Sequence, residues 1–238
     1  MTTDRIAERL AANGIPFSSV LPEQIAVYMR MLTEWNSRMD LTAVTEEEET
    51  LDRHFVDSLM LLKTGYPGNT ETLIDVGTGA GFPGLVIALA CPGMKVTLLD
   101  AQQKRLDFLQ AVCDALSVQN VTVIHGRAED GARRTDMREK YDLAVARAVA
   151  PLNVLCEYLL PYVRIGGMAL CWKGPGLRDE TETGRRAAFL LGGETGLPIP
   201  YQIIGHDWEH VLMPVKKVRP TPKEYPRKAG TPKNKPLG

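Results

Sequence analysis

The sequence is poor in cysteine and histidine and has no long apolar run, which excludes several classes of protein. Its 238 residues include only four cysteines and four histidines. The cysteines form no CxxC pair and lie in apolar segments, which predicts reduced core residues rather than disulfides or metal ligands. No apolar run reaches the length of about 18 residues that a membrane span requires. Residues 1–13 have no apolar signal core, so we expect a cytoplasmic protein that is not secreted.

Net charge is also nearly absent, at −1 for the whole chain, but it is unevenly distributed. Residues 216–238 contain eight basic residues and one acidic residue, whereas residues 1–215 contain 20 basic and 28 acidic residues. The tail therefore carries +7 and the remainder −8. A basic tail predicts contact with an anionic partner, and its prolines predict an extended, mobile segment without helix or strand after about Val218.

The hydrophobic pattern changes near residue 65. Residues 1–65 predict helices over Asp4–Ala12, Pro22–Arg38 and Glu46–Leu62, and a break follows at Gly65–Asn69. Strands are then expected at Thr72–Val76, Lys95–Leu99, Val121–Ile124, Asp142–Ala146, Met168–Trp172, Gln202–Ile204 and Val211–Val215. Helices are expected between them at Pro83–Ala90, Gln102–Leu116, Pro151–Val163 and Leu177–Leu191. This alternation predicts an α/β fold with a Rossmann-like, doubly wound, mostly parallel sheet over 66–215, an N-terminal helical region over 1–65 and a basic tail over 216–238.

A glycine-rich loop carries the strongest functional signal. The run Leu73–Gly84 reads LIDVGTGAGFPG, an apolar strand that passes directly into glycines and then a helix. Glycines allow a tight turn and close approach of the backbone to a ligand. One pattern in the run is GxGxxG, typical of dinucleotide sites, and a second is DxGxGxG beginning at Asp75. The second places its first glycine directly after the strand and is the pattern of S-adenosylmethionine-dependent methyltransferases.

Polar residues follow the other predicted strands. Asp100 ends the second strand, where a carboxylate can accept from ribose hydroxyls or, alternatively, cap the next helix. Arg147 ends the fourth strand and requires an anionic partner, either a cofactor carboxylate or an acid of the N-terminal region. The D/N-P-P-aromatic tetrad of adenine amino methyltransferases is missing there. Chemistry without a polarised exocyclic amine is therefore favoured.

Several stretches of the chain resemble the small-subunit ribosomal RNA methyltransferase G family, also called glucose-inhibited division protein B. They are Trp35-Asn36 with Leu41-Thr42, Arg53–Leu59, Asp75–Gly84, Leu98–Asp100 with Lys104-Arg105, Arg147-Ala148 with Leu152, and the tail Lys223–Pro232. Asp40 departs from the asparagine that the family usually has. The resemblance implies methyl transfer from S-adenosylmethionine to N7 of a guanine in the 530 loop of 16S ribosomal RNA, guanine 527 in the usual numbering.

The predicted site combines the loop, the strand ends and the resemblance. Cofactor contacts are expected from Asp75, Gly77, Gly79, Gly81, Phe82, Asp100, Ala101, Ala128, Glu129 and Arg147. RNA contacts are expected from Arg53, Lys104, Arg105, Lys216, Lys217, Arg219, Lys223, Arg227 and Lys228. Guanine N7 has a lone pair and no proton at neutral pH, so no general base is required, and Arg147 and His54 are assigned positioning roles. We expect 16S rRNA or the small ribosomal subunit as partner, a monomer, no metal and no membrane.

Other classes of function remain open at this point. A nicotinamide-dependent oxidoreductase would bind NAD rather than S-adenosylmethionine. A catalytically silent RNA-binding protein of the same fold would transfer no methyl group. A methyltransferase could also act on a small molecule or a protein, although the basic tail favours RNA.

Overall fold

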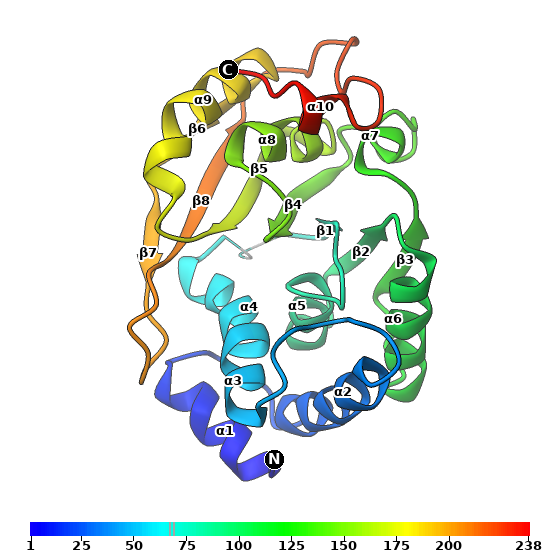
Figure 1. Cartoon of the computed structure of the whole chain (residues 1–238), viewed down its shortest axis with the longest axis vertical. Helices are drawn as coiled ribbons and strands as arrows, with labels where there is room; N and C mark the ends of the chain where they lie inside the picture. Colours follow the sequence, from blue (N-terminus) through cyan, green and yellow to red (C-terminus); the bar gives the residue numbers. More distant parts are fainter. Residues whose placement is uncertain (67, 69) are drawn as a thin grey trace.

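The protein is built around one mixed sheet. The computed structural model describes residues 1–66, 68 and 70–238. The strands are β1 (Thr72–Val76), β2 (Lys95–Asp100), β3 (Val121–His125), β4 (Tyr141–Arg147), β5 (Val163–Lys173), β6 (Gly193–Thr195), β7 (Ile199–Tyr201) and β8 (His210–Lys217). Their order is β3–β2–β1–β4–β5–β8–β6, with β7 also paired to β8 (Figure 1). Strands β1 to β5 pair in parallel and β8 is antiparallel to its neighbours, which confirms the predicted Rossmann-like sheet.

Helices cover both faces of this sheet. They are α1 (Thr3–Ala12), α2 (Leu21–Asn36), α3 (Glu47–Thr50), η1 (Leu51–Val56), α4 (Asp57–Leu59), η2 (Met60–Thr64), α5 (Gly84–Ala90), α6 (Gln103–Ala115), α7 (Ala128–Gly131), α8 (Leu152–Leu159), α9 (Leu177–Leu190) and α10 (Thr231–Asn234). The predicted N-terminal helices are present. Buried residues such as Ile6, Tyr28 and Phe55 share one core with α5 and α6, while α8 and α9 pack on the opposite face (Figure 1).

One helical segment of the N-terminal region approaches the end of β4. The segment runs from Glu47 to Thr64 and replaces the predicted helix Glu46–Leu62. Its middle turn, Leu51–Val56, is a π-helix, a widened turn that is frequent at functional sites. That turn carries Arg53 and His54. The predicted break after it lies partly outside the described residues, since 67 and 69 are not among them.

The C-terminal part of the sheet differs from the prediction. No strand forms at Gln202–Ile204; the strand is Ile199–Tyr201. Its central Pro200 cannot donate to a ladder, but β7 pairs only with β8, and an edge strand tolerates proline. The sequence also failed to predict β6. Strand β8 continues to Lys217, so the expected boundary at residue 216 falls inside a strand.

The basic tail is folded against the body, so the prediction of a mobile segment without regular structure is wrong. Helix α10 forms within it and packs near α8 (Figure 1). The Arg138 guanidinium donates to the backbone carbonyls of Thr221, Pro222 and Tyr225 at 2.9, 3.2 and 2.8 Å. Prolines exclude the tail from a sheet ladder, and these arginine contacts satisfy the carbonyl groups that a ladder would otherwise pair.

Candidate functional site

The glycine-rich loop between β1 and α5 is held by the adjacent strand. The amides of Gly77 and Thr78 donate to the Leu99 carbonyl at 2.8 and 3.1 Å, and the Gly79 amide donates to Asp100 Oδ2 at 2.9 Å. Gly77 and Gly79 have φ of +76° and +61°, a region that other residues enter at a cost. A Cβ built on Gly79 would meet no atom within 4 Å, because this part of the loop borders open space.

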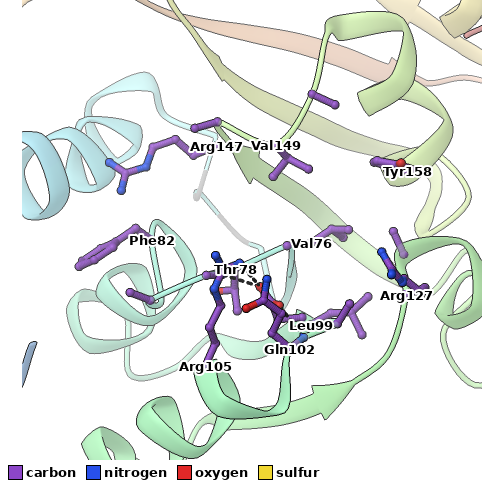
Figure 2. Close-up of a pocket in the computed structure, with 18 of the residues that line it drawn as sticks. Val76, Thr78, Phe82, Leu99, Gln102, Arg105, Arg127, Arg147, Val149 and Tyr158 are labelled. Atoms are coloured by element: carbon purple, nitrogen blue, oxygen red, sulfur yellow. Dashed lines mark hydrogen bonds and ion pairs between the residues drawn. The ribbon is translucent and has the colours of Figure 1, made fainter. Parts of the chain in front are cut away.

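That space is a cavity of about 600 Å³ beyond the carboxyl ends of the parallel strands (Figure 2). Ligands of doubly wound sheets bind at this edge. Eight predicted cofactor residues line it, namely Gly77, Gly79, Phe82, Asp100, Ala101, Ala128, Glu129 and Arg147. Residues that the sequence did not assign to the cofactor also line it, among them Leu41, Thr42, Gln102, Val149, Tyr158 and Lys233. The cavity thus brings together the N-terminal region, three strand ends and the tail.

Asp75 is not among the lining residues, and its predicted contact with the cofactor is corrected. Its side chain is fully buried and turns under the loop, where Oδ2 accepts from Thr78 Oγ1 at 2.7 Å and from the Gly84 amide at 2.8 Å. Burial raises the pKa of this carboxyl to about 6, although the two hydrogen bonds oppose the shift. Asp75 therefore braces the loop from below.

Gly81 is also outside the cavity, contrary to the prediction. It has φ +94°, and a Cβ there would overlap Tyr28 Oη and lie 2.8 Å from Leu109. The Tyr28 hydroxyl donates to the Ala80 carbonyl. Glycine is required at position 81 so that α2 can pack against the loop.

Asp100 lines the cavity but already has several partners. Oδ2 accepts from the Gly79 amide, Oδ1 accepts from the Gln102 amide at 2.9 Å, and Arg105 Nη1 lies 3.5 Å from Oδ2. The carboxylate therefore joins the glycine loop to the start of α6. Both roles considered from the sequence, a ligand at the strand end and a contact to the helix start, are compatible with this position.

Arg147 is held by the N-terminal region. Its Nη1 donates to Asp57 Oδ2 at 2.8 Å and to the Arg53 carbonyl, and its Nη2 lies 3.2 Å from His54 Nδ1. An N-terminal acid, one of the two partners considered from the sequence, is therefore paired with Arg147. Burial opposes ionisation of Asp57, but hydrogen bonds from His210, Tyr201 and Arg147 outweigh it and hold the pKa of Asp57 below its usual value.

His54 connects this ion pair to the cavity. Burial and the neighbouring Arg147 charge lower the pKa of His54 to about 4, so the imidazole is neutral at physiological pH. Because Nδ1 faces the Arg147 guanidinium, Nε2 carries the proton and donates to Thr42 Oγ1 at 2.7 Å. The ring stacks on Phe82 with centroids 4.7 Å apart. His54 therefore lines the cavity as an uncharged side chain in a fixed orientation.

Asp57, Tyr201 and His210 complete the cluster around Arg147. Asp57 Oδ1 accepts from Tyr201 Oη at 2.5 Å and lies 2.8 Å from His210 Nδ1. Nothing local in the sequence pointed to Tyr201 and His210, which lie about 150 residues away along the chain.

The predicted RNA-binding residues divide into two groups. Lys104, Lys216, Arg219, Lys223 and Lys228 are exposed, although Arg219 also donates to the Phe189 carbonyl at 2.9 Å. The others have partners within the protein: Arg53 pairs with Glu49, Arg105 with Asp100, and Arg227 with Glu157. Lys217 is fully buried, donating to the Leu160 carbonyl at 2.6 Å, so its predicted contact with RNA is corrected. Burial lowers the pKa of Lys217 to about 8.

The described residues contain neither a cluster suited to a metal ion nor a membrane-spanning helix. Within residues 1–66, 68 and 70–238, no three His, Cys, Asp or Glu side chains are grouped so that they could hold a metal ion. Over the same part of the chain, no helix has the length and apolar character needed to cross a membrane.

Comparisons with known proteins agree with this architecture. The family model described as rRNA small subunit methyltransferase G (GidB) matches residues 22–198. The chain is 46% identical to Ribosomal RNA small subunit methyltransferase G of Alkaliphilus metalliredigens over 90% of each chain, and 43% identical to that of Alkaliphilus oremlandii over 98% of each. The crystal structure of a MtNAS variant in complex with S-adenosylmethionine matches the fold with a TM-score of 0.53 and 16% identity, covering 91% of this chain and 89% of that one.

The relatives match nearly the whole length of the chain, and the family model matches most of it. These matches confirm the predicted methyltransferase fold, the cofactor S-adenosylmethionine and the rRNA methyltransferase activity. They contradict the alternative of a nicotinamide-dependent oxidoreductase. The chain belongs to the rRNA small subunit methyltransferase G (GidB) family.

Proposed function

We propose that the protein transfers a methyl group from S-adenosylmethionine to N7 of a guanine in 16S rRNA, guanine 527 by family resemblance. A second cavity, of about 440 Å³, supports the proposal. It shares His54, Arg147, Ala148 and Ala150 with the cofactor cavity and extends toward Glu180 and His210. Transfer of a methyl group requires the cofactor and the acceptor base to lie side by side, and two adjoining cavities can hold them so.

The residues present fit the cofactor. Gly77 and Gly79 line the cavity: a Cβ on Gly79 would extend into open space, and one on Gly77 would lie 3.1 Å from the Val149 side chain. Asp100 and Glu129 are buried carboxylates at the border of the cavity. When bound there, S-adenosylmethionine supplies a methyl group on a positively charged sulfur. We assign Gly77, Gly79, Phe82, Asp100, Ala101, Ala128 and Glu129 to holding it, and Arg147 and His54 to shaping the boundary with the second cavity.

The chemistry needs no proton transfer from the protein. The guanine N7 lone pair forms the new bond to the methyl carbon, while the sulfur retains the electron pair of the old bond. Because the pKa values of His54 and Asp57 are both lowered, His54 stays neutral and Asp57 stays ionised across the physiological range, as residues that only position the reactants should. Alignment of reacting groups can supply roughly 7–11 kcal/mol of a barrier.

We assign the remaining partner contacts to the exposed basic residues Lys104, Lys216, Arg219, Lys223 and Lys228. Their phosphate contacts would set the register of the RNA without reading its sequence. We propose 16S rRNA or the small ribosomal subunit as substrate, a single copy of the chain as the acting unit, and the cytoplasm as its location.

The test is radiolabelled methyl transfer to small subunits isolated from cells that lack this protein, followed by mapping of the labelled nucleotide. Label on guanine N7 at a single position of 16S rRNA is expected. The single-turnover rate should be nearly constant between about pH 6 and 9, because no base must be deprotonated. Label at an exocyclic amine, or a rate that rises about tenfold per pH unit, would contradict the proposal.

A further inference from the structure

Two of the eight basic residues of the tail, Lys217 and Arg227, form ion pairs with the body of the protein. Lys217 pairs with Glu139 at 3.1 Å, and Arg227 Nη2 lies 2.6 Å from Glu157 Oε2. Glu157 is fully buried, and Arg227 Nε also donates to its Oε1 at 3.0 Å. A bidentate pair between an arginine and a buried carboxylate fixes both orientation and position. These contacts place the end of the chain against α8 and α7 (Figure 1).

Two features connect the tail to the cofactor cavity. The Gly230 amide donates to Glu129 Oε1 at 2.7 Å, and Glu129 both lines the cavity and is only 3% exposed. Three residues later, Lys233 itself lines the cavity, together with Tyr158 and Arg127, which Figure 2 shows on the side away from Phe82. The tail therefore contributes part of the cavity wall.

We infer that the C-terminal tail closes the cofactor cavity and that Lys233 is a cofactor-binding residue. The inference rests on the proposed function, which places the methyl group where the two cavities meet, at His54 and Arg147. The adenosyl end of the cofactor then lies at the opposite end, beside Glu129 and Lys233. Adenine ring nitrogens are acceptors without charge, and the Lys233 ammonium is a donor that can reach an acceptor at that border.

The same geometry gives the tail a second effect. Glu129 has its orientation set by the Gly230 amide, so release of the tail removes both a donor and the support of a lining carboxylate. Cofactor binding and tail docking must then favour each other by the same factor. The basic tail is thus part of the cofactor site as well as a surface for RNA.

Calorimetric titration with S-adenosylhomocysteine, which binds without reacting, tests this with four proteins. They are the full chain, Lys233→Ala, a chain ending at Ala229, and Lys235→Ala. Lys235 is an exposed lysine on the same segment that does not line the cavity, so its variant controls for loss of one positive charge. Loss of a charge-assisted hydrogen bond predicts roughly tenfold or greater weakening for Lys233→Ala. The truncation should weaken binding at least as much, and Lys235→Ala should bind as the full chain does.

The outcomes separate the inference from the function it rests on. Equal affinity of Lys233→Ala, the truncated chain and the full chain would overturn the inference and leave the proposed function intact. No binding by the full chain would instead overturn the proposed function. If the truncated chain unfolds, Lys233→Ala and Lys233→Met decide the matter, because a single exposed substitution leaves the Arg227–Glu157 pair in place. Equal weakening by Lys235→Ala would show a general charge effect and would also overturn the inference.

Discussion

Removal of the Arg147 side chain should destabilise the protein by about 3–5 kcal/mol. The pair is mostly buried, with 15% of the Arg147 side chain and 4% of the Asp57 side chain exposed, and the two charged groups are 2.8 Å apart. Arg147→Ala leaves Asp57 with its contacts to Tyr201 and His210 but without the guanidinium. Loss of one partner from a buried ion pair strands the other charge, which typically costs about 3–5 kcal/mol.

A double-mutant cycle measures the pair itself. Urea unfolding at pH 7.5 gives the free energy of unfolding for wild type, Arg147→Ala, Asp57→Ala and the double variant. Because each single variant strands a partner and the double variant does not, the double variant should be more stable than the sum of the single effects implies, by about 1.5–3 kcal/mol. Arg147→Lys should recover only part of the loss, since one ammonium cannot reach Asp57, the Arg53 carbonyl and His54 together.

Two results would refute this reasoning. The first is a free energy of unfolding for Arg147→Ala within about 1 kcal/mol of wild type, the range of exposed ion pairs. The second is a cycle that is additive within about 0.5 kcal/mol, which would show that the two residues act independently. Either would mean that the N-terminal helical segment is not held to β4 through this pair.

Three further predictions concern the loop and its surroundings. The folded pKa of His54 is about 4, below its unfolded value near 6.5. The free energy of unfolding of wild type should therefore fall relative to that of His54→Gln as pH falls from 6.5 to 4, by up to about 1.4 kcal/mol per pH unit. Urea unfolding that shows the same pH dependence for both proteins would contradict this. The pH dependence of stability has the opposite sign for Asp75, because its folded pKa is raised to about 6. Thermal unfolding should show the stability of Asp75→Asn relative to wild type increasing from pH 4 to pH 6 and then levelling off. Gly81→Ala should lower the free energy of unfolding by more than about 3 kcal/mol, on the order of an overpacked core, and Tyr28→Phe should restore part of that loss. Gly79→Ala should lower it by only about 1–2 kcal/mol, because its backbone is left-handed but its surroundings are open. Equal losses at the two glycines would be inconsistent with the packing described.

The sequence by itself determined the parallel part of the sheet and the position of the site. Strand Thr72–Val76 was predicted to the residue, because a short apolar run bounded by glycines has few alternatives. The glycine loop, Asp100 and Arg147 each directly follow or end a parallel strand, and parallel strands bring their carboxyl ends to one edge. Local order along the chain, together with the family resemblance that supplied Phe82, Ala128 and Glu129, placed eight of the ten predicted cofactor residues around one cavity.

Tertiary structure alone decided which partners the charged residues have. Asp75 and Gly81 fit a ligand-binding pattern, but Asp75 turns toward Gly84 and Gly81 makes room for Tyr28, since α2 packs against the loop. The tail has the composition of a mobile segment, yet buried carboxylates and the Arg138 guanidinium, from elements distant in sequence, bind it to the body. The composition of a segment gives its net charge. Its free energy of docking depends instead on burial and on complementary groups, which only the folded chain brings within hydrogen-bond distance.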